Sequence, residues 1–334
     1  MDSCQGKILV IRGGAIGDFI LTLPAIAALR RQFPRAWLEV LGYPHIVRLA
    51  EAGGLVDRAQ FIEARPLAGF FARQGLLEPD MKDYFSEFDL IVSYLYDPDG
   101  IFQSNVGRCT SAPFIAGPHR ADEQVGLHAA KAYLQPLERL AIFDADPVPR
   151  LRLQQQPDTL SYLALMPGSG SPRKNWPEAN WSDLLQALIN ETPADLLLVG
   201  AEAEAERLQR LAAALPPERF RLAQSLPLPE LGSLLQGGAG FLGHDSGISH
   251  LAAALGLPGI VLWGDTAPEV WRPPSPKVVL VRHPAGLSGL PTRQVLARLR
   301  EMCLWAKQGS DQELRTPDCG LRTTDYGPRA PDLG

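Results

Sequence analysis

Four polar loops in the sequence carry side chains suited to moving a proton or holding an anion. The first is the turn at residues 12–18, in which three glycines precede Asp18. Glycines let a backbone turn tightly and approach a ligand. The spacing differs from the dinucleotide fingerprint and no Gly-Lys-Ser/Thr follows, so neither that site nor a P-loop is indicated. Asp18 stands at or near a helix start, where it is either a helix cap or a general base.

The second loop, residues 167–177, is rich in glycine and serine and carries two cations. Exposed amides and hydroxyls, together with cations, suit a diphosphate. Lys174 would supply a point charge, and Arg173 a planar fork of donors. An ordinary solvated loop is the alternative interpretation.

The third loop, residues 243–250, leads into an alanine-rich helix. Ser246 and Gly247 would present backbone amides at that helix start, where an anion is favoured. Asp245 would then bind ligand or simply cap the helix. In the fourth loop, residues 200–204, a carboxylate would accept hydrogen bonds from a ribose or begin an ordinary solvated helix.

Two other chemistries find little support in these loops. His244 and His250 lack the further ligands that a metal site needs, so we expect no metal. No G-x-S-x-G elbow is present, which argues against a serine hydrolase. The cysteines are scattered and form no C-x-x-C pair, a pattern that fits a reducing cytoplasm rather than zinc or disulfides; they are Cys4, Cys109, Cys303 and Cys319.

The loops follow short apolar runs that read as strands, and most of these runs alternate with helical patterns. This order predicts an α/β fold with parallel, doubly wound sheets, in which ligands bind beyond the carboxyl ends of the strands. We expect strands at residues 7–11, 37–41, 89–92, 114–116, 162–166, 195–199, 239–242 and 259–263. We expect helices from the first turn to about residue 33 and at 45–52, 123–134, 181–189, 204–214, 231–235, 248–255 and 293–305.

The chain has 334 residues, enough for two domains. A proline- and glutamine-containing stretch at 144–158 predicts a linker between domains at 1–150 and 159–308, and the polar segment 309–334 predicts a flexible tail. The net charge of −5 and the lack of a basic run argue against a nucleic-acid partner. No apolar stretch reaches the length of a membrane span.

Together and in this order, the four loops resemble glycosyltransferase family 9, the ADP-heptose:lipopolysaccharide heptosyltransferases. The matching stretches are KILVIRGGAIGDFILTLPAIAALR, MPGSGSPRKNWPEANW, VGAEAEAER and FLGHDSGISHLAAALGLPGIVLWG. The resemblance implies the GT-B architecture, two Rossmann-like domains facing a central cleft. It places the acceptor mainly on the N-terminal domain and the nucleotide sugar mainly on the C-terminal one. It also implies inverting transfer with no metal and no cofactor.

The resemblance implies roles for individual residues. Asp18 falls on the catalytic aspartate, and Arg12 and Gly17 belong to the same first loop. On the donor side it assigns Ser169, Lys174, Glu204, Asp245, Ser246, Gly247, Ile248 and His250. This chain departs from the family at Gly170, where a hydroxyl residue is common. It also departs at residues 70–107, which carry Tyr94, Tyr96, Asp97 and Asp99 instead of a basic cluster for an anionic acceptor.

We therefore expect an enzyme that moves a heptose-like sugar from ADP-heptose to a lipopolysaccharide-type or other glycan acceptor. Asp18 would take the acceptor proton. The expected location is the cytoplasm, with a peripheral contact at the cytoplasmic face of the inner membrane as an option. Two alternatives stay open: a GT-B enzyme that uses a UDP-sugar, and a non-catalytic protein that binds a sugar nucleotide.

Overall fold

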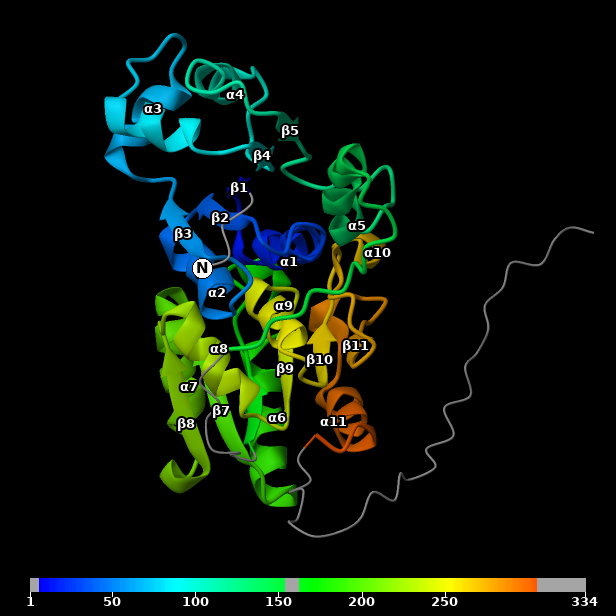
Figure 1. Ribbon diagram of the computed structural model, residues 1–334. Coiled ribbons are helices and arrows are strands. Elements are labelled where there is room, and N and C mark those ends of the chain that lie inside the picture. The colour runs from blue at the N-terminus through cyan, green and yellow to red at the C-terminus, as the bar shows by residue number, and fades with distance from the viewer. Residues whose placement is uncertain (1–5, 154–161, 305–334) are drawn as a thin grey trace, which may run out of the picture.

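The computed structural model describes residues 6–153 and 162–304, and in these residues the chain forms two β-sheets (Figure 1). The N-terminal sheet has five strands in the order β3-β2-β1-β4-β5, and the C-terminal sheet has six in the order β11-β10-β9-β6-β7-β8. Neighbouring strands run parallel in both sheets. The predicted α/β class with two doubly wound sheets is confirmed.

The N-terminal domain contains the strands β1 (Lys7–Arg12), β2 (Trp37–Gly42), β3 (Arg58–Phe61), β4 (Leu90–Ser93) and β5 (Phe114–Ala116), and the helices α1 (Ile16–Gln32), α2 (Pro44–Ala52), α3 (Pro79–Ser86), α4 (Ile101–Val106) and α5 (Ala129–Leu134). The C-terminal domain contains the strands β6 (Tyr162–Leu165), β7 (Asp195–Gly200), β8 (Phe220–Gln224), β9 (Gly240–His244), β10 (Gly259–Leu262) and β11 (Val278–Val281). Its helices are α6 (Glu178–Glu191), α7 (Ala205–Ala212), α8 (Leu228–Gln236), α9 (Gly247–Ala254), α10 (Pro268–Trp271) and α11 (Thr292–Glu301). Short 3-10 turns join them at Arg65–Phe71, Gln135–Leu140, Pro172–Lys174, Glu202–Glu204, Pro217–Arg219 and Leu287–Gly289.

The central strands are apolar throughout because each of their faces is covered. In β1, Ile8 and Val10 pack in the apolar layer between the two domains, while Leu9 and Ile11 pack on the outer face of the sheet. The alternation follows from the two-residue period of a strand. The layer between the domains contains side chains from both of them, so the two domains share one continuous core.

Helix α1 lies in that shared layer and packs against both α5 and α9 (Figure 1). Its residues from Phe19 to Ile26 are buried without interruption, which explains why it lacks the polar stripe of a surface helix. Pro24 is inside the helix and does not mark its first turn. The start of α1 is therefore fixed against the C-terminal domain, close to the start of α9.

A second contact joins the domains beside α10. The indole Nε1 of Trp271 donates to the carboxylate of Glu123 at 2.7 Å, and the Arg120 guanidinium lies 5.2 Å from the centre of the same indole ring. His128 Nε2 is 2.8 Å from the backbone oxygen of Arg272. Together with packing between α2 and α8, these contacts hold the two domains together on more than one side.

The structure corrects one predicted helix and adds strands. The helix expected at residues 123–134 begins only at Ala129, because Gly126 is left-handed (φ +67°) and His128 caps the helix with its ring nitrogen. Strands β3, β8 and β11 were not predicted. The tail expected at 309–334 lies outside the described residues, and the domain boundaries at 150 and 159 stay a prediction.

Candidate functional site

Asp18 is the third residue of α1, and its carboxylate has contacts on both oxygens. Oδ2 accepts the backbone N–H of Ala15 at 3.2 Å, which makes Asp18 part of the helix cap. Oδ1 accepts the hydroxyl of Tyr133 from α5 at 3.2 Å. The side chain is 25% exposed, so it still faces solvent. The capping interpretation is therefore correct, and it leaves the carboxylate accessible for a second role.

Arg12 is a buried cation directly behind Asp18. Its side chain is 1% exposed, and one terminal nitrogen lies 3.6 Å from Asp18 Oδ1. The other donates to the backbone oxygens of Tyr94 (3.1 Å) and His119 (2.7 Å), and the guanidinium lies 4.6 Å from the centre of the Tyr133 ring. The guanidinium charge attracts the neighbouring carboxylate, and burial screens this attraction less than water would. Arg12 therefore supports Asp18 and does not face a ligand itself.

A cavity of about 780 Å³ opens between the two domains beside the start of α1. This volume is in the range of pockets that hold small molecules and nucleotides. Its walls come from both domains and are mostly apolar at the end near α8. The predicted residues among them are Gly17, Ser169, Glu204, Ser246, Gly247 and Ile248, and those not predicted include Pro44, His45, Arg48, Met166, Leu226 and Leu228.

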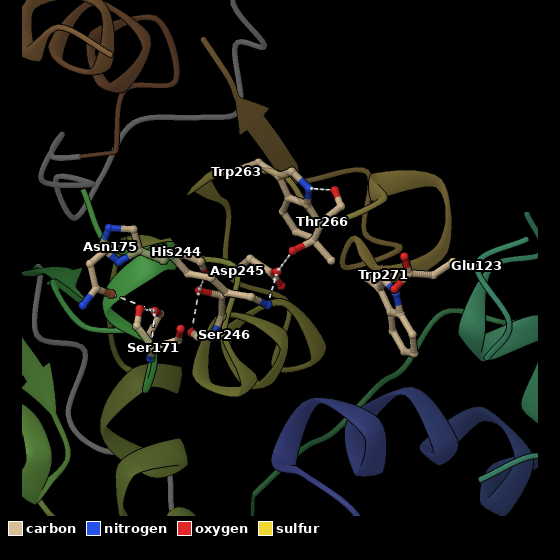
Figure 2. Close-up of polar contacts among 12 residues, drawn as sticks. Glu123, Ser171, Asn175, His244, Asp245, Ser246, Trp263, Thr266 and Trp271 are labelled. Atoms are coloured by element: carbon tan, nitrogen blue, oxygen red, sulfur yellow. Dashed lines mark hydrogen bonds and ion pairs between the residues drawn. The ribbon is translucent and has the colours of Figure 1, made fainter. Parts of the chain in front are cut away.

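Lys174 and Asp245 meet at the start of α9. The Lys174 ammonium donates to Asp245 Oδ2 at 2.6 Å, and the hydroxyl of Thr266 donates to the same oxygen at 2.7 Å (Figure 2). Trp263 Nε1 in turn donates to the backbone oxygen of Thr266 at 2.6 Å. Asp245 is buried and fixes the ammonium beside the helix start. The ion pair uses one of the three ammonium hydrogens, so the other two can bind a ligand.

Ser246, rather than Asp245, caps α9, because its hydroxyl accepts the N–H of Ser249 at 3.3 Å. The alternative in which Asp245 is the cap is wrong. The backbone N–H groups of the first turn, at Gly247 and Ile248, have no partner within the helix, as at any helix start. Lys174 lies next to this helix start through its ion pair with Asp245, although neither of the two residues is among those that line the cavity.

The glycine loop after β6 is held by its own hydroxyls and by Glu204. Ser169 Oγ donates to the backbone oxygen of Ser171 (2.9 Å) and lies 2.7 Å from the side-chain oxygen of Asn175. Glu204 accepts the N–H of Gly170 on one oxygen (3.0 Å) and that of Ala201 on the other (2.9 Å). The geometry thus gives Glu204 a role in shaping the loop, and its predicted contact with the nucleotide stays a prediction.

The two histidines of the third loop are buried and differ in their contacts. His244 Nε2 accepts the backbone N–H of Trp176 at 2.8 Å, which ties the second loop to β9. Burial lowers the pKa of His244 to about 4, so the ring is neutral at physiological pH, as an acceptor nitrogen requires. His250 lies against Gly17 of α1, and burial lowers its pKa as well. The described residues contain no cluster of His, Cys, Asp or Glu side chains that could hold a metal ion.

Sequence reasoning missed Tyr133 and Thr266, which contact the two carboxylates of the site. Tyr133 is 115 residues from Asp18, and Thr266 is 21 residues from Asp245. Neither belongs to a local motif. Only the packing of α5 against α1, and of the loop after β10 against α9, brings them to the site.

Within the described part of the chain, no helix is both long and apolar enough to span a bilayer.

Replacing Lys174 with alanine is expected to weaken nucleoside diphosphate binding by about ten- to a hundredfold, the cost of a charge-assisted contact. Asp245 would also lose its cation, so the melting temperature must be recorded for the same sample. Asp245→Asn is the matched variant, because it removes the ion pair but keeps the ammonium. Calorimetry with ADP measures both variants, and unchanged affinity in Lys174→Ala would remove Lys174 from the site.

Comparisons with known proteins agree with this fold. The family model described as glycosyltransferase family 9 (heptosyltransferase) matches residues 138–296. Lipopolysaccharide heptosyltransferase 1 of Pseudomonas aeruginosa is 27% identical over 301 residues, which cover 78% of this chain and 79% of the relative. A family 9 glycosyltransferase structure from Veillonella parvula superimposes with a TM-score of 0.75 at 17% identity and covers 92% of this chain and 99% of its own.

An Escherichia coli heptosyltransferase solved with ADP has a TM-score of 0.69 at 20% identity and covers 89% of this chain and 99% of its own. At such identities the solved structures establish the fold alone, and the sequence relatives extend the match to both domains. The GT-B architecture expected from the sequence is confirmed. The chain is a glycosyltransferase that resembles the heptosyltransferases of family 9.

Proposed function

We propose that this enzyme transfers a heptose from ADP-heptose, or from a closely similar donor, to a sugar of a lipopolysaccharide-core or related glycan, with inversion and without a metal. The observation that carries the proposal is a nucleotide-sized cavity between the domains. It is lined on one side by Gly17, next to Asp18, and on the other by the first turn of α9, which follows the Lys174–Asp245 pair. The P. aeruginosa relative is named a lipopolysaccharide heptosyltransferase, and one similar structure holds ADP.

The reaction needs a base on one side of the transferred sugar and positive charge on the other. As the acceptor oxygen attacks the anomeric carbon, the bond from that carbon to the diphosphate oxygen breaks, and the electron pair leaves with the diphosphate. The acceptor proton passes to the Asp18 carboxylate. Attack from the face opposite the leaving group inverts the anomeric centre, so a single carboxylate is sufficient.

The departing diphosphate gains negative charge, which positively charged groups and backbone N–H groups beside it would stabilise. Lys174 and the free N–H groups at the start of α9 are fixed before the reaction, so they stabilise the charge without reorganising. Asp245 and Thr266 contribute by holding the ammonium at that position. The packing of α1 against α9 brings the proposed base close to the start of α9.

Donor choice is tested by thermal shift with ADP, UDP and GDP, followed by transfer assays. A nucleotide at a hundred times its Kd adds about 2.7 kcal/mol to the free energy of unfolding. We expect ADP to raise the melting temperature and ADP-heptose to give a product of inverted anomeric configuration with EDTA present. Stabilisation by UDP alone would replace the donor with a UDP-sugar. The proposal includes action at the cytoplasmic face of the inner membrane, which cell fractionation tests.

A further inference from the structure

Tyr96 and His119 form an exposed aromatic pair beside the catalytic turn. Their ring centres are 4.5 Å apart, and the Tyr96 side chain belongs to the few large apolar groups at the surface, with 66% of the residue exposed. His119 is also exposed. Rings of this kind have large apolar faces, which can pack against the apolar C–H face of a pyranose.

The strand register places this pair at the same end of the sheet as Asp18. Beyond the paired strands, Tyr94 still donates to the backbone oxygen of Ile11 (2.8 Å), and Gly117 donates to that of Ser93 (2.8 Å). The segments that follow β1, β4 and β5 therefore leave the sheet side by side. Leu95 contacts Gly13, since a Cβ on that glycine would lie 3.2 Å from the Leu95 side chain.

Arg12 fixes this arrangement to the base. Its guanidinium binds the backbone oxygens of Tyr94 and His119, and it lies 3.6 Å from Asp18 Oδ1. Tyr96 and His119 thus belong to two short segments whose backbone is hydrogen-bonded to the buried Arg12, which also lies close to Asp18. Such anchoring holds the rings in place while they stay exposed, which is what a binding platform requires.

The aromatic pair does not line the proposed donor cavity, although both are close to the turn at residues 12–18. The cavity is lined by Ala15, Ile16 and Gly17, but by no residue of the segments that carry Tyr96 and His119. An acceptor that attacks opposite the diphosphate must approach Asp18 from the side that the donor leaves free. The aromatic pair lies on the N-terminal domain, the same domain as Asp18, so an acceptor bound to the pair would reach Asp18 from that side.

The charges in these segments indicate what kind of acceptor fits. Arg120 pairs with Glu123 at 3.4 Å, and Arg73 pairs with Asp99 at 3.8 Å. Asp97 accepts the N–H groups of Phe102 and Gln103 at the start of α4. The two cations are each matched by a carboxylate, so this surface has no excess positive charge to select an anionic sugar.

We propose that Tyr96, backed by His119, is the platform for the acceptor sugar, and that it selects an uncharged pyranose. This inference rests on the proposed function, since it assigns the acceptor of the same reaction. It differs from a site for a carboxylated or phosphorylated sugar, which would need unpaired cations. Tyr96 acts by stacking on the acceptor ring while Asp18 takes the proton.

The test uses the full chain saturated with ADP and two oligosaccharide probes of equal length. One ends in a neutral heptopyranose and the other in a carboxylated sugar. Saturation-transfer NMR and titration are expected to show tighter binding of the neutral probe, and Tyr96→Ala is expected to raise its Kd roughly tenfold. Tyr96→Phe keeps the ring and is expected to stay within about twofold of the wild type. Phe143→Ala, which removes a 63% exposed aromatic outside the site, is the matched control.

Binding and transfer separate the two proposals. If the neutral probe binds and Tyr96→Ala weakens it, the platform holds even where no heptose is transferred, and only the proposed donor or reaction fails. If heptose is transferred normally and Tyr96→Ala leaves the acceptor KM unchanged, the platform is wrong and the function stands. Tighter binding of the carboxylated probe, or no binding of the neutral one, overturns the inference.

Discussion

Replacing Asp18 with asparagine is expected to lower the rate of sugar transfer by roughly 10²–10⁴-fold, the range that general-base catalysis supplies. Asparagine has nearly the same size and caps helices about as well as aspartate, so the N–H of Ala15 keeps an acceptor. The amide does not accept the acceptor proton. Single-turnover transfer from a confirmed donor measures the loss, because it reports the chemical step and not product release.

The same substitution has a structural cost that must be measured separately. Asp18 is the carboxylate nearest to Arg12, whose guanidinium is almost wholly buried. Removing the negative charge leaves that cation poorly compensated, and we expect a loss of about 1–3 kcal/mol in the free energy of unfolding. Tyr133→Phe is the matched control, because it removes one hydrogen bond to Asp18 but leaves the base.

Rates of the two variants are compared well below both melting temperatures. Tyr133→Phe is expected to lose a few-fold in rate, far less than Asp18→Asn. If Asp18→Asn transfers sugar at nearly the wild-type rate, Asp18 is a cap and a counter-charge for Arg12 only. ADP affinity is expected to change little in either variant, because the contacts proposed for the diphosphate, Lys174 and the start of α9, belong to the C-terminal domain.

Most strands with continuous apolar runs could be predicted, although β11 (VVLV) was missed. The strands β1, β6 and β9 are buried on both faces, so their residues are apolar at nearly every position and stand out from the loops. The strands β3 (RAQF) and β8 (FRLAQ) include polar residues, because each lies at an edge of its sheet and is partly exposed. Such edge strands look like loops in a single sequence.

The sequence predicts which loops carry the candidate site, but it does not predict which side chains in those loops contact each other. Lys174, Asp245 and Ser246 were found because each lies in a polar loop after a strand, at the end of the sheet where ligands bind. Which of these groups pair with each other depends on tertiary structure. The sequence gives no sign that Lys174 is paired with Asp245, or that Glu204 binds the N–H of Gly170 in a loop 34 residues away.

Gly247 illustrates a constraint that only the packed domains show. From the sequence we expect Gly247 to present its backbone amide to an anion at the start of α9. In the structure the same position also faces the start of α1. A Cβ added to Gly247 would lie 2.6 Å from Ile16 Cβ and 3.1 Å from the backbone nitrogen of Gly17. Real Cβ atoms essentially never make a contact of 2.6 Å, so α1 and α9 would have to separate.

Gly247→Ala is therefore expected to reduce sugar transfer by about 10²-fold, the effect of displacing reacting groups by about 1 Å. The added methyl moves Asp18, carried on α1, away from the Lys174 and α9 group. ADP affinity is expected to fall much less than the rate, because the backbone N–H groups of α9 and the ammonium stay in one domain. Single-turnover transfer and calorimetry with ADP measure the two quantities on the same preparation.

Gly17→Ala is the matched comparison, because it adds the same methyl from the opposite side of the interface. Its Cβ would lie 3.5 Å from the His250 ring and 3.7 Å from Gly247 Cα, which are ordinary van der Waals distances. We expect it to lose only a few-fold in rate, since nothing has to move by as much as the ~1 Å that costs 10²-fold. Equal losses in the two variants would mean that any side chain in this corner blocks the donor. A normal rate in Gly247→Ala would mean that catalysis does not need α1 and α9 this close.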